Sequence, residues 1–234
     1  LKQVDTAEYN PFEFVKTNVL GSQNVIDAAI ETGVKKVVAL STDKASSPIN
    51  LYGATKLTAD KLFVAANNYS DSFGTTMSVV RYGNVMGSRG SVIPFFRRLV
   101  AEGKPIPITD PRMTRFWITL PQAVQFVIDS FETMQGGELY VPRIPSMKIM
   151  DLVQAIAPDS QTFEVGIRPG EKLHEEMITE TDSLNTIEFE HYFVILPSTQ
   201  LWDTEKFRKE SSTKEGTRCE YGFAYNSGTN PDFL

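Results

Sequence analysis

Apolar strand-like runs alternate with helical segments in the first part of the chain, and this pattern constrains the fold most. The run Lys-Val-Val-Ala-Leu at 36–40 is short, apolar and β-branched, which predicts a strand buried on both faces. Residues 51–68 are rich in Ala, Leu and Lys and predict a helix, and residues 77–82 predict the next strand. A strand, a helix and a strand in this order predict a right-handed βαβ unit, so we expect an α/β fold with a doubly wound parallel sheet.

Before residue 36 and after residue 82, helices and strands are also expected, but they alternate less regularly. Asn10 and Pro11 predict a capped helix start, and this helix is expected to end at Gly33. Beyond the strand at 77–82 we expect a smaller α/β part, with helices at 93–101, 119–134, 147–156 and 173–178 and strands at 138–141, 163–167 and 192–196. The charged, Ser/Thr-rich stretch 205–220 predicts a solvated surface segment.

Charge and composition exclude several classes of partner. The chain of 234 residues has 23 Lys and Arg against 29 Asp and Glu, a net charge of -6, so a broad attraction to nucleic acid is not expected. The longest charge-free apolar stretch, 116–128, contains Pro121 and is shorter than the roughly 20 residues that cross a bilayer, so no membrane is expected. The single cysteine, Cys219, fits a reducing compartment, and we expect the cytoplasm.

Tyr52 and Lys56 lie four residues apart and therefore share one face of the predicted helix. A phenol with a pKa of about 10 is a poor base at neutral pH, but a nearby ammonium group stabilises the phenolate and lowers that pKa. Residues 41–44, Ser-Thr-Asp-Lys, follow a strand at its carboxyl end, where open α/β sheets bind ligands. A Tyr-x-x-x-Lys pair alone is more often structural, but this context favours a site for hydride transfer.

The order of strand, hydroxyl-rich loop, Tyr-x-x-x-Lys helix and buried strand resembles the catalytic core of the short-chain dehydrogenase/reductase superfamily. Further motifs at 41–45, 50–56, 81–85 and 87–92, and later segments at 114–118, 144–148 and 166–175, resemble the nucleotide-sugar 4,6-dehydratases. The similarity is strongest to the inverting UDP-N-acetylglucosamine 4,6-dehydratases of the pseudaminic acid pathway. The glycine-rich turn that opens this family is absent, and residue 1 is Leu, so we expect both ends to be cut from a longer chain.

The resemblance implies a role for each residue of the 41–56 region. It assigns Tyr52, supported by Lys56 and Thr42, to the oxidation of the sugar at C4, Asp43 to the role of acid toward the C6 hydroxyl, and Lys44 to the role of base at C5. Lys44 must lose its proton for this role, which burial or the nearby Lys56 would promote by lowering its pKa. The C5-retaining relatives commonly have Met in place of Tyr52, so we expect inversion at C5.

The resemblance also implies a nicotinamide cofactor, NADP with NAD as an alternative. The residues expected to contact it are Ser41, Tyr52, Lys56, Val85, Met86, Gly87, Ser88 and Arg89. Gly83, Gly87 and Gly90 imitate a glycine fingerprint, but we interpret them as part of the family's later substrate loop. On the same resemblance, residues 1–84 and 119–141 form the second half of the dinucleotide-binding domain, and 85–118 and 142–234 form the substrate-binding domain.

The expected substrate is UDP-N-acetylglucosamine, contacted by Lys2, Asn84 and Arg168, of which Arg168 suits a diphosphate. Arg115 is a weaker candidate that could pair with Asp110, and Glu171 is another that could cap a helix. Neither His174 nor His191 has Cys or His partners at metal-ligand spacing, so no metal is expected. A homo-oligomer is expected for the full-length protein.

Two other functions stay open. A UDP-sugar 4-epimerase shares the Tyr-x-x-x-Lys helix and the C4 oxidation, but it has no need of the adjacent Asp43 and Lys44. A binding protein without catalytic activity, built on a dehydrogenase fold, is the second alternative.

Overall fold

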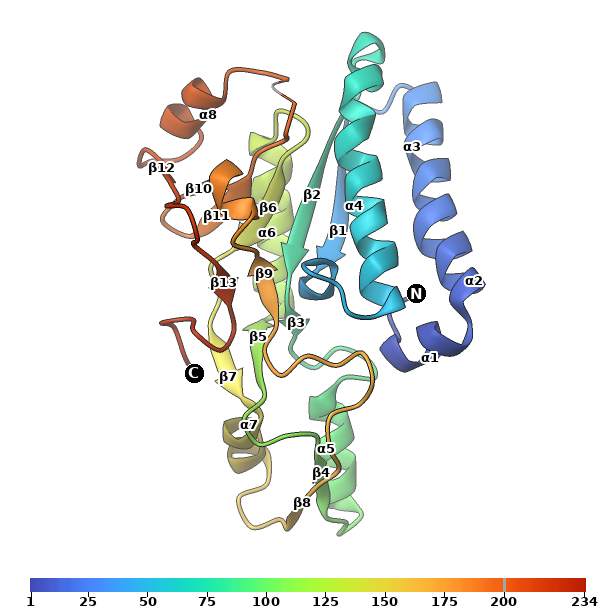
Figure 1. Cartoon of the computed structure of the whole chain (residues 1–234), viewed down its shortest axis with the longest axis vertical. Helices are drawn as coiled ribbons and strands as arrows, with labels where there is room; N and C mark the ends of the chain where they lie inside the picture. The colour runs from blue at the N-terminus through green and yellow to red at the C-terminus, as the bar shows by residue number, and fades with distance from the viewer. Residues whose placement is uncertain (200) are drawn as a thin grey trace.

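Three parallel strands begin the largest sheet: β1 (Lys36–Thr42), β2 (Thr76–Tyr82) and β6 (Leu139–Pro142). The computed structural model describes residues 1–199 and 201–234. In these residues β1 pairs only with β2, so it forms one edge of the sheet. The β1–α4–β2 unit that the sequence predicts is therefore present, and Figure 1 shows helix α4 (Leu51–Ser70) beside these strands.

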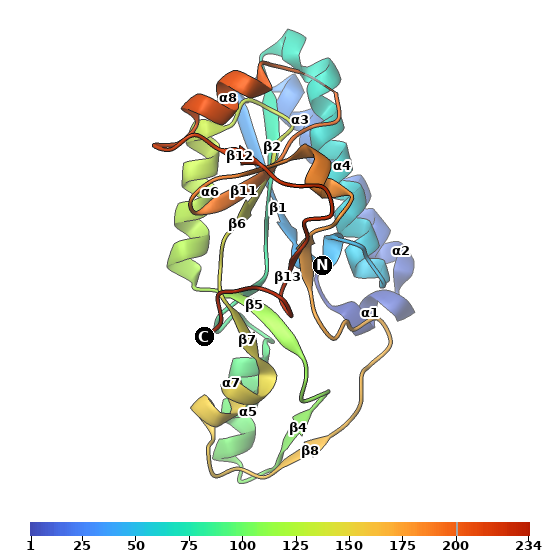
Figure 2. The same ribbon diagram turned by 60° about the vertical axis from the view of Figure 1, so that its left-hand side comes forward.

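Helices cover both faces of this sheet, as the doubly wound fold predicts (Figure 2). On one face, Ile26 of α3 (Gly21–Glu31) and Phe63 of α4 pack in one core cluster with Met77 and Val79 of β2. On the other face, Val80 of β2 packs in a second cluster against α6 (Leu120–Thr133). The alternation of neighbouring β2 residues between the two clusters follows from the two-residue period of a strand.

Three antiparallel strands complete the sheet beyond β6. Its order is β1-β2-β6-β11-β10-β12, with β11 (Tyr192–Ile195) antiparallel to β6 and followed by β10 (Thr186–Glu188) and β12 (Thr217–Arg218). Helix α8 (Thr204–Glu210) lies in this C-terminal segment, after an Asp203 side chain that accepts two backbone hydrogen bonds at its start. These strands join the main sheet, although the predicted division assigns residues 142–234 to the substrate-binding part.

The smaller part lies at the lower end of the molecule in Figure 1. It contains α5 (Val92–Ala101) and α7 (Ile149–Ile156), the parallel pair β4 (Ile106–Ile108) and β8 (Thr162–Glu164), and the sheet β3 (Asn84–Val85), β5 (Thr114–Ile118) and β7 (Ser146–Lys148). Phe96, Trp117 and Leu152 are buried in its core. The antiparallel pair β9 (Glu176–Ile178) and β13 (Tyr225–Asn226) lies between this part and the main sheet.

The N-terminal helical segment differs in detail from the expectation. It comprises α1 (Val4–Tyr9), α2 (Pro11–Phe14), a π-helix η1 (Val15–Leu20) and α3, with 3₁₀ turns later at Asp43–Ala45 (η2), Asp71–Phe73 (η3) and Asp182–Asn185 (η4). Pro11 occupies the first helical turn as predicted, but Asn10 does not cap it, because its side-chain amide donates to the Thr6 carbonyl instead. Gly33 follows the helix with a positive φ of 71°.

Two other expectations are wrong. β1 is not buried on both faces, because it is an edge strand, and Leu40 is 49% exposed. Residues 176–178 form strand β9 rather than a helix, because they pair with β13. The charged stretch at 205–220 lies at the surface as expected, with most of its residues exposed, and its first part belongs to helix α8, which Phe207 anchors.

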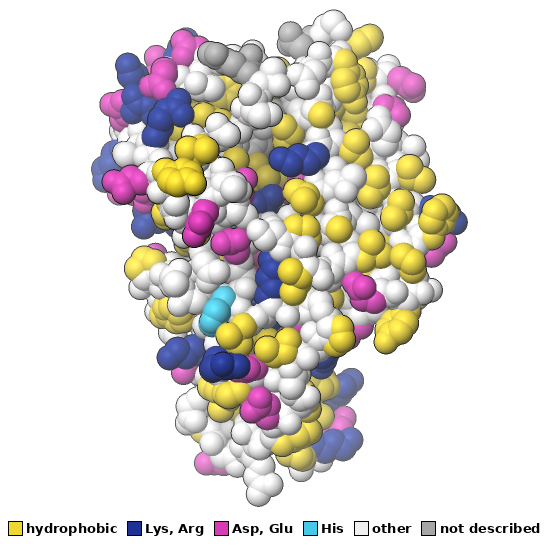
Figure 3. Space-filling view, viewed as in Figure 1, with side chains coloured by type: hydrophobic (Ala, Val, Ile, Leu, Met, Phe, Trp, Pro, Cys, Tyr) yellow, Lys and Arg dark blue, Asp and Glu magenta, His cyan; other side chains and the backbone are white. Residues whose placement is uncertain are grey.

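Apolar side chains also reach the surface of the first helices. Figure 3 shows them scattered over the side of the molecule formed by α3 and α4, where Val25 and Tyr69 are exposed. No helix among the described residues is long and apolar enough to cross a membrane.

Candidate active site

The carboxyl end of β1 turns directly into a compact polar loop. Thr42 is extended, and its hydroxyl donates a 2.9 Å hydrogen bond to Asp43 Oδ1 and accepts a 3.4 Å bond from the Lys44 backbone amide. These bonds stabilise the 3₁₀ turn η2. They hold the side chains of Thr42, Asp43 and Lys44, three of the expected catalytic residues, close together.

Asp43 and Lys44 form the charged centre of this loop. Lys44 Nζ lies 3.1 Å from Asp43 Oδ1 and 3.4 Å from Glu175 Oε1, which comes from the segment just before β9. Both carboxylates are buried, and the Lys44 side chain is 23% exposed. Among the described residues, Asp43 Oδ2 and Glu175 Oε2 have no hydrogen-bond partner. Two buried carboxylates therefore share one ammonium group.

This arrangement changes the expected proton affinity of Lys44. Burial lowers the pKa of Lys44, but Asp43 and Glu175 raise it more strongly, and the net pKa lies above its ordinary value. The sequence led us to expect the opposite direction, because Glu175 is distant in the chain and its approach could not be seen. Lys44 is consequently an ammonium ion in this arrangement.

Helix α4 presents Tyr52 to the loop in its first turn. Asn50 caps the helix, since its side-chain oxygen accepts a 2.7 Å bond from the Gly53 amide. A Cβ atom at Gly53 would overlap the Lys44 carbonyl oxygen, so this position requires glycine for α4 to approach η2. Tyr52 is buried against Ala7 and Phe14 in a small apolar cluster.

The environment of the Tyr52 phenol differs from the expected pairing with Lys56. Burial raises the pKa of Tyr52, while the Thr42 hydroxyl and the Lys44 ammonium act in the opposite direction. Lys56 instead donates a 2.7 Å hydrogen bond to the Leu40 carbonyl, and burial lowers the pKa of Lys56. The cation that stabilises a phenolate here is therefore Lys44.

Ser41 belongs to a separate buried network. Its hydroxyl donates a 2.7 Å bond to Asp60, whose Oδ2 also lies 3.3 Å from Arg81. Arg81 in turn donates to the Met177 carbonyl at 2.9 Å. This network ties β1, α4, β2 and β9 together, so Ser41 holds the loop in place. Sequence reasoning missed it, although Arg81, the one charged residue of strand β2, was a signal.

A pocket of about 380 Å³ contains two of the three residues expected to bind the sugar nucleotide, and Lys2 is not among its lining residues. It is lined by Asn84 and Arg168 and also by Arg115 and Glu171. Arg168 is exposed and lies 3.7 Å from both Asp5 and Glu171. The pocket thus brings together residues that the sequence places in three distant segments.

Arg115 does not pair with Asp110. Asp110 accepts hydrogen bonds from Arg112 at 2.7 and 3.0 Å, whereas Arg115 lies 3.9 Å from Glu175. Glu171 accepts a 3.4 Å bond from the Arg168 amide, within an irregular segment and not at a helix start. Its interpretation as a helix cap is therefore wrong.

The loop expected to contact a cofactor follows β3. Val85, Met86 and Ser88 are half-buried, and Gly87 and Arg89 are exposed. Lys2 reaches this loop, since its Nζ donates a 3.2 Å bond to the Arg89 carbonyl. Gly87 and Gly90 have positive φ angles and open space beside them, whereas Gly83 packs against Phe116. Gly83 therefore serves the close approach of β3 and β5.

The two histidines make different polar contacts. The His174 ring nitrogen Nδ1 lies 2.7 Å from the Thr114 hydroxyl, and the His191 carbonyl accepts a bond from the Arg143 amide. The described residues contain no group of three metal-ligating side chains.

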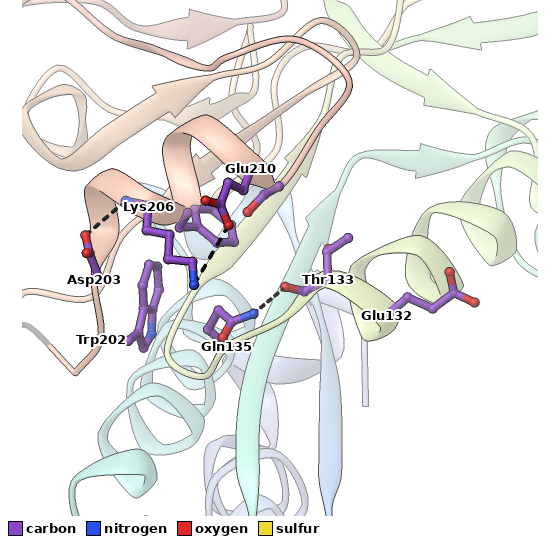
Figure 4. Close-up of a pocket in the computed structure, with 9 residues that line it drawn as sticks. Glu132, Thr133, Gln135, Trp202, Asp203, Lys206 and Glu210 are labelled. Carbon is purple, nitrogen blue, oxygen red and sulfur yellow. Dashed lines mark hydrogen bonds and ion pairs between the residues drawn. The ribbon is translucent and has the colours of Figure 1, made fainter.

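A second pocket, of about 410 Å³, lies where the end of α6 meets α8 (Figure 4). Trp202, Lys206 and Glu132 are among its lining residues, and Lys206 pairs with Glu210. None of the expected catalytic, cofactor-binding or substrate-binding residues lines it, so we exclude it from the candidate site.

The sequence is similar to those of several known enzymes that act on UDP-sugars. A profile of the polysaccharide biosynthesis protein family matches residues 1–197. The UDP-N-acetylglucosamine 4,6-dehydratase (inverting) of Campylobacter jejuni strain 81-176 is 57% identical over 235 aligned positions, which cover all of this chain and 70% of that protein. A UDP-glucose 4-epimerase of Rickettsia canadensis is 40% identical over 199 positions, covering 83% of this chain and 58% of that protein.

A solved structure shows the same fold. The X-ray structure of Pen from Bacillus thuringiensis superposes with a TM-score of 0.87 at 40% identity, covering 98% of this chain and 69% of that chain. The expected α/β fold is thereby confirmed. From the profile match and the extent of the identity, we conclude that the chain belongs to the polysaccharide biosynthesis protein family and is a relative of its inverting UDP-N-acetylglucosamine 4,6-dehydratases.

Proposed function

We propose that this protein is a hydro-lyase that converts UDP-N-acetylglucosamine to a C5-inverted 4-keto-6-deoxy sugar. The observation that carries the proposal is the 3.1 Å contact between Lys44 and Asp43. Lys44 and Thr42 of the same loop also act to lower the pKa of the Tyr52 phenol. A base and an acid side by side are what removal of water across two adjacent carbons requires. The identity to the Campylobacter jejuni dehydratase supports the same reaction.

The residues around Tyr52 and Lys56 fit a nicotinamide cofactor. Lys56 uses one of its three N–H donors on the Leu40 carbonyl, so the others can bond ribose hydroxyls, and the 85–89 loop offers open backbone beside Gly87. When bound, such a cofactor supplies the hydride acceptor for C4 oxidation and the hydride donor for C6. We propose NADP on the family resemblance, with NAD as the alternative.

The first chemical step uses the phenol. Tyr52 accepts the proton of the C4 hydroxyl as C4 is oxidised to a ketone, and the Thr42 hydroxyl and Lys44 ammonium stabilise the phenolate that this requires. The ketone then acidifies the proton on C5. Lys44 thus serves this step in its charged form.

The elimination step needs a different protonation state of the same pair. Transfer of one proton from Lys44 to Asp43 across their 3.1 Å contact gives a neutral amine and a neutral carboxylic acid. The amine accepts the C5 proton and the acid donates its proton to the departing C6 hydroxyl, so one water leaves. The pair then returns to the ion pair found here, with no net change in protons.

Substrate contacts follow from the pocket of about 380 Å³. Arg168 is the candidate ligand of the diphosphate, with Asn84 inside the pocket and Lys2 beside the Arg89 backbone. The division into a dinucleotide-binding and a substrate-binding domain, with this pocket in the second, is part of the proposal.

A 4-epimerase is the nearest alternative, and the Rickettsia canadensis relative carries that name. It needs C4 oxidation but neither an acid at C6 nor a base at C5. The paired Asp43 and Lys44 favour the dehydratase, and the same pair argues against a binding protein without catalytic activity.

The remaining proposals concern the cellular setting. A place in a pseudaminic acid type of pathway and a homo-oligomeric full-length protein rest on the family resemblance alone. The unpaired Cys219 fits a reducing compartment, which supports the cytoplasm.

The test is to incubate the protein and its cofactor with UDP-N-acetylglucosamine in deuterated water. Mass spectrometry is expected to show the loss of one water, and magnetic resonance an inverted, deuterated C5. A product of unchanged mass that is epimeric at C4 would support the epimerase, and retention at C5 would contradict inversion. Under the proposal, Asp43→Asn permits C4 oxidation but stalls water loss.

A further inference from the structure

Glu175 is a buried carboxylate that the sequence did not single out. Its side chain is 3% exposed, and its backbone is fixed on both sides by one residue of the C-terminal segment. The Glu175 amide donates to Ser227 Oγ at 2.9 Å, and the Glu175 carbonyl accepts from the Ser227 amide at 2.8 Å. The position of the carboxylate is therefore set by the pairing of β9 with β13.

The carboxylate lies between two cations. Glu175 Oε1 is 3.4 Å from Lys44 Nζ and 3.9 Å from Arg115 Nε. Arg115 is held in turn, since its guanidinium donates to the carbonyls of Thr114, Lys172 and Leu173 at 2.6, 3.0 and 3.1 Å. Asp43, Lys44, Glu175 and Arg115 thus form a row of alternating charge, anchored at its far end by backbone carbonyls.

Lys44 needs such an anchor because a lysine side chain is long and flexible. Asp43 is its sequence neighbour and cannot be its only fixed partner during elimination, since Asp43 then carries the proton for the C6 hydroxyl. A neutral amine retains two N–H donors and one lone pair. The Glu175 side chain, 3.4 Å away, can accept a hydrogen bond from one of those N–H groups, which fixes the direction of the lone pair that takes the C5 proton.

We propose that Glu175 is a positioning residue for Lys44 in the elimination step. This inference rests on the proposed dehydratase function and deepens it. Glu175 contacts the base and not the reacting carbons. During C4 oxidation the ionised Asp43 still holds the Lys44 ammonium at 3.1 Å, so loss of Glu175 affects chiefly the later proton transfer at C5, when Asp43 is protonated. The competing explanation is that Glu175 is only the buried counter-ion of Arg115, which would affect stability and all steps alike.

The experiment separates these explanations by measuring two steps in one holoenzyme. Hydride removal from C4 is followed by the absorbance of the reduced nicotinamide in a single turnover, and C5 proton transfer by deuterium uptake from solvent. For Glu175→Gln, which keeps the shape and removes the charge, we expect C5 exchange to fall by at least about tenfold while hydride removal stays within about twofold. Glu176→Gln is the matched control, because Glu176 is the next residue and bonds Ser47.

A second variant covers the case in which Glu175→Gln does not fold. Glu175→Asp keeps the buried charge but withdraws the carboxylate by one methylene from its 3.4 Å contact with Lys44. We expect the same selective loss of C5 exchange. Unchanged exchange in the folded variants, or equal losses in both steps, would overturn the inference. A wild-type protein that does not dehydrate the substrate would instead refute the proposed function.

Discussion

The side-chain amide of Asn50 donates a 2.8 Å hydrogen bond to the carbonyl oxygen of Gly170, far along the chain. The same side chain caps helix α4 through its oxygen, so one residue holds both the helix that bears Tyr52 and the turn that follows Arg168. Lys172 adds a parallel link by donating to the Ser46 carbonyl at 2.7 Å. The proposed catalytic loop and the proposed substrate-binding turn are therefore positioned by shared polar contacts.

Replacing Asn50 is expected to weaken both functions of its side chain. Loss of the cap and of the bond to Gly170 in Asn50→Ala is expected to destabilise the fold by about 1–2 kcal/mol, the usual cost of removing a helix cap. The KM for the sugar nucleotide is expected to rise, because the Arg168 turn loses its link to α4. Thermal melting and steady-state kinetics check this, with Asn68→Ala at the exposed end of α4 as the control. An unchanged melting temperature would show that the cap contributes nothing.

Tyr52→Phe is expected to block C4 oxidation. The variant removes the proton acceptor and leaves the ring in its apolar cluster with Ala7 and Phe14. We expect a fall of about 10²- to 10⁴-fold in hydride removal, the usual contribution of a positioned acid or base. Tyr69→Phe, on the exposed end of the same helix, is expected to behave as wild type. Rapid formation of reduced nicotinamide in Tyr52→Phe would assign the proton transfer to another group.

Arg168→Ala is expected to raise KM by about tenfold to a hundredfold with little change in kcat, since a charged hydrogen bond to a phosphate contributes about 1.5–3 kcal/mol to binding. The diphosphate is unchanged during the reaction, so its contact stabilises the substrate and the transition state equally. Arg98→Ala on α5 removes a similarly exposed arginine and serves as the control. A loss confined to kcat would mean that Arg168 acts on the chemical step.

The pair formed by Asp110 and Arg112 predicts an acid-dependent contribution to stability. Hydrogen bonds from the Arg112 side chain and backbone amide lower the pKa of Asp110 from 3.8 to about 2. A carboxyl whose pKa is lower in the folded state stabilises the fold above its unfolded pKa and loses this contribution as the pH falls. The difference in melting temperature between wild type and Asp110→Asn is therefore expected to shrink between about pH 4 and pH 2. A constant difference over this range would contradict the lowered pKa of Asp110. Asp27→Asn, at an exposed position of α3, is the control.

The elements predicted best are those whose signals are local. The β1–α4–β2 unit follows from apolar runs and a helical stretch that each occupy one continuous segment. The sequence of residues 173–178 predicts a helix, but residues 176–178 form a strand, in which Ile178 lies opposite Tyr225. Pairing with a distant strand decided their conformation, which local propensity cannot foresee.

The same limit applies to the site. Asp43, Lys44 and Tyr52 could be placed together because they lie in one short stretch after a strand. The pKa direction of Lys44 could not be predicted, because Glu175 approaches it only in the folded chain. Likewise Arg115 lies near Glu175 because β5 packs beside the segment before β9. The spacing of these residues in the sequence does not predict that contact.

The position of β6 in the sheet affects the order in which the chain folds. This strand of four residues pairs with β2 on one side and with β11 on the other, so both of its partners are separated from it by long intervening segments. Contacts between distant segments form slowly, because the entropy of closing a long loop is lost before any contact compensates for it. During synthesis β6 therefore leaves the ribosome before β11 exists, with its outer edge and the apolar side chains of Leu139 and Val141 unpaired. Refolding of this protein is expected to be limited by docking of the C-terminal strands onto β6, and self-association during that interval to depend on protein concentration.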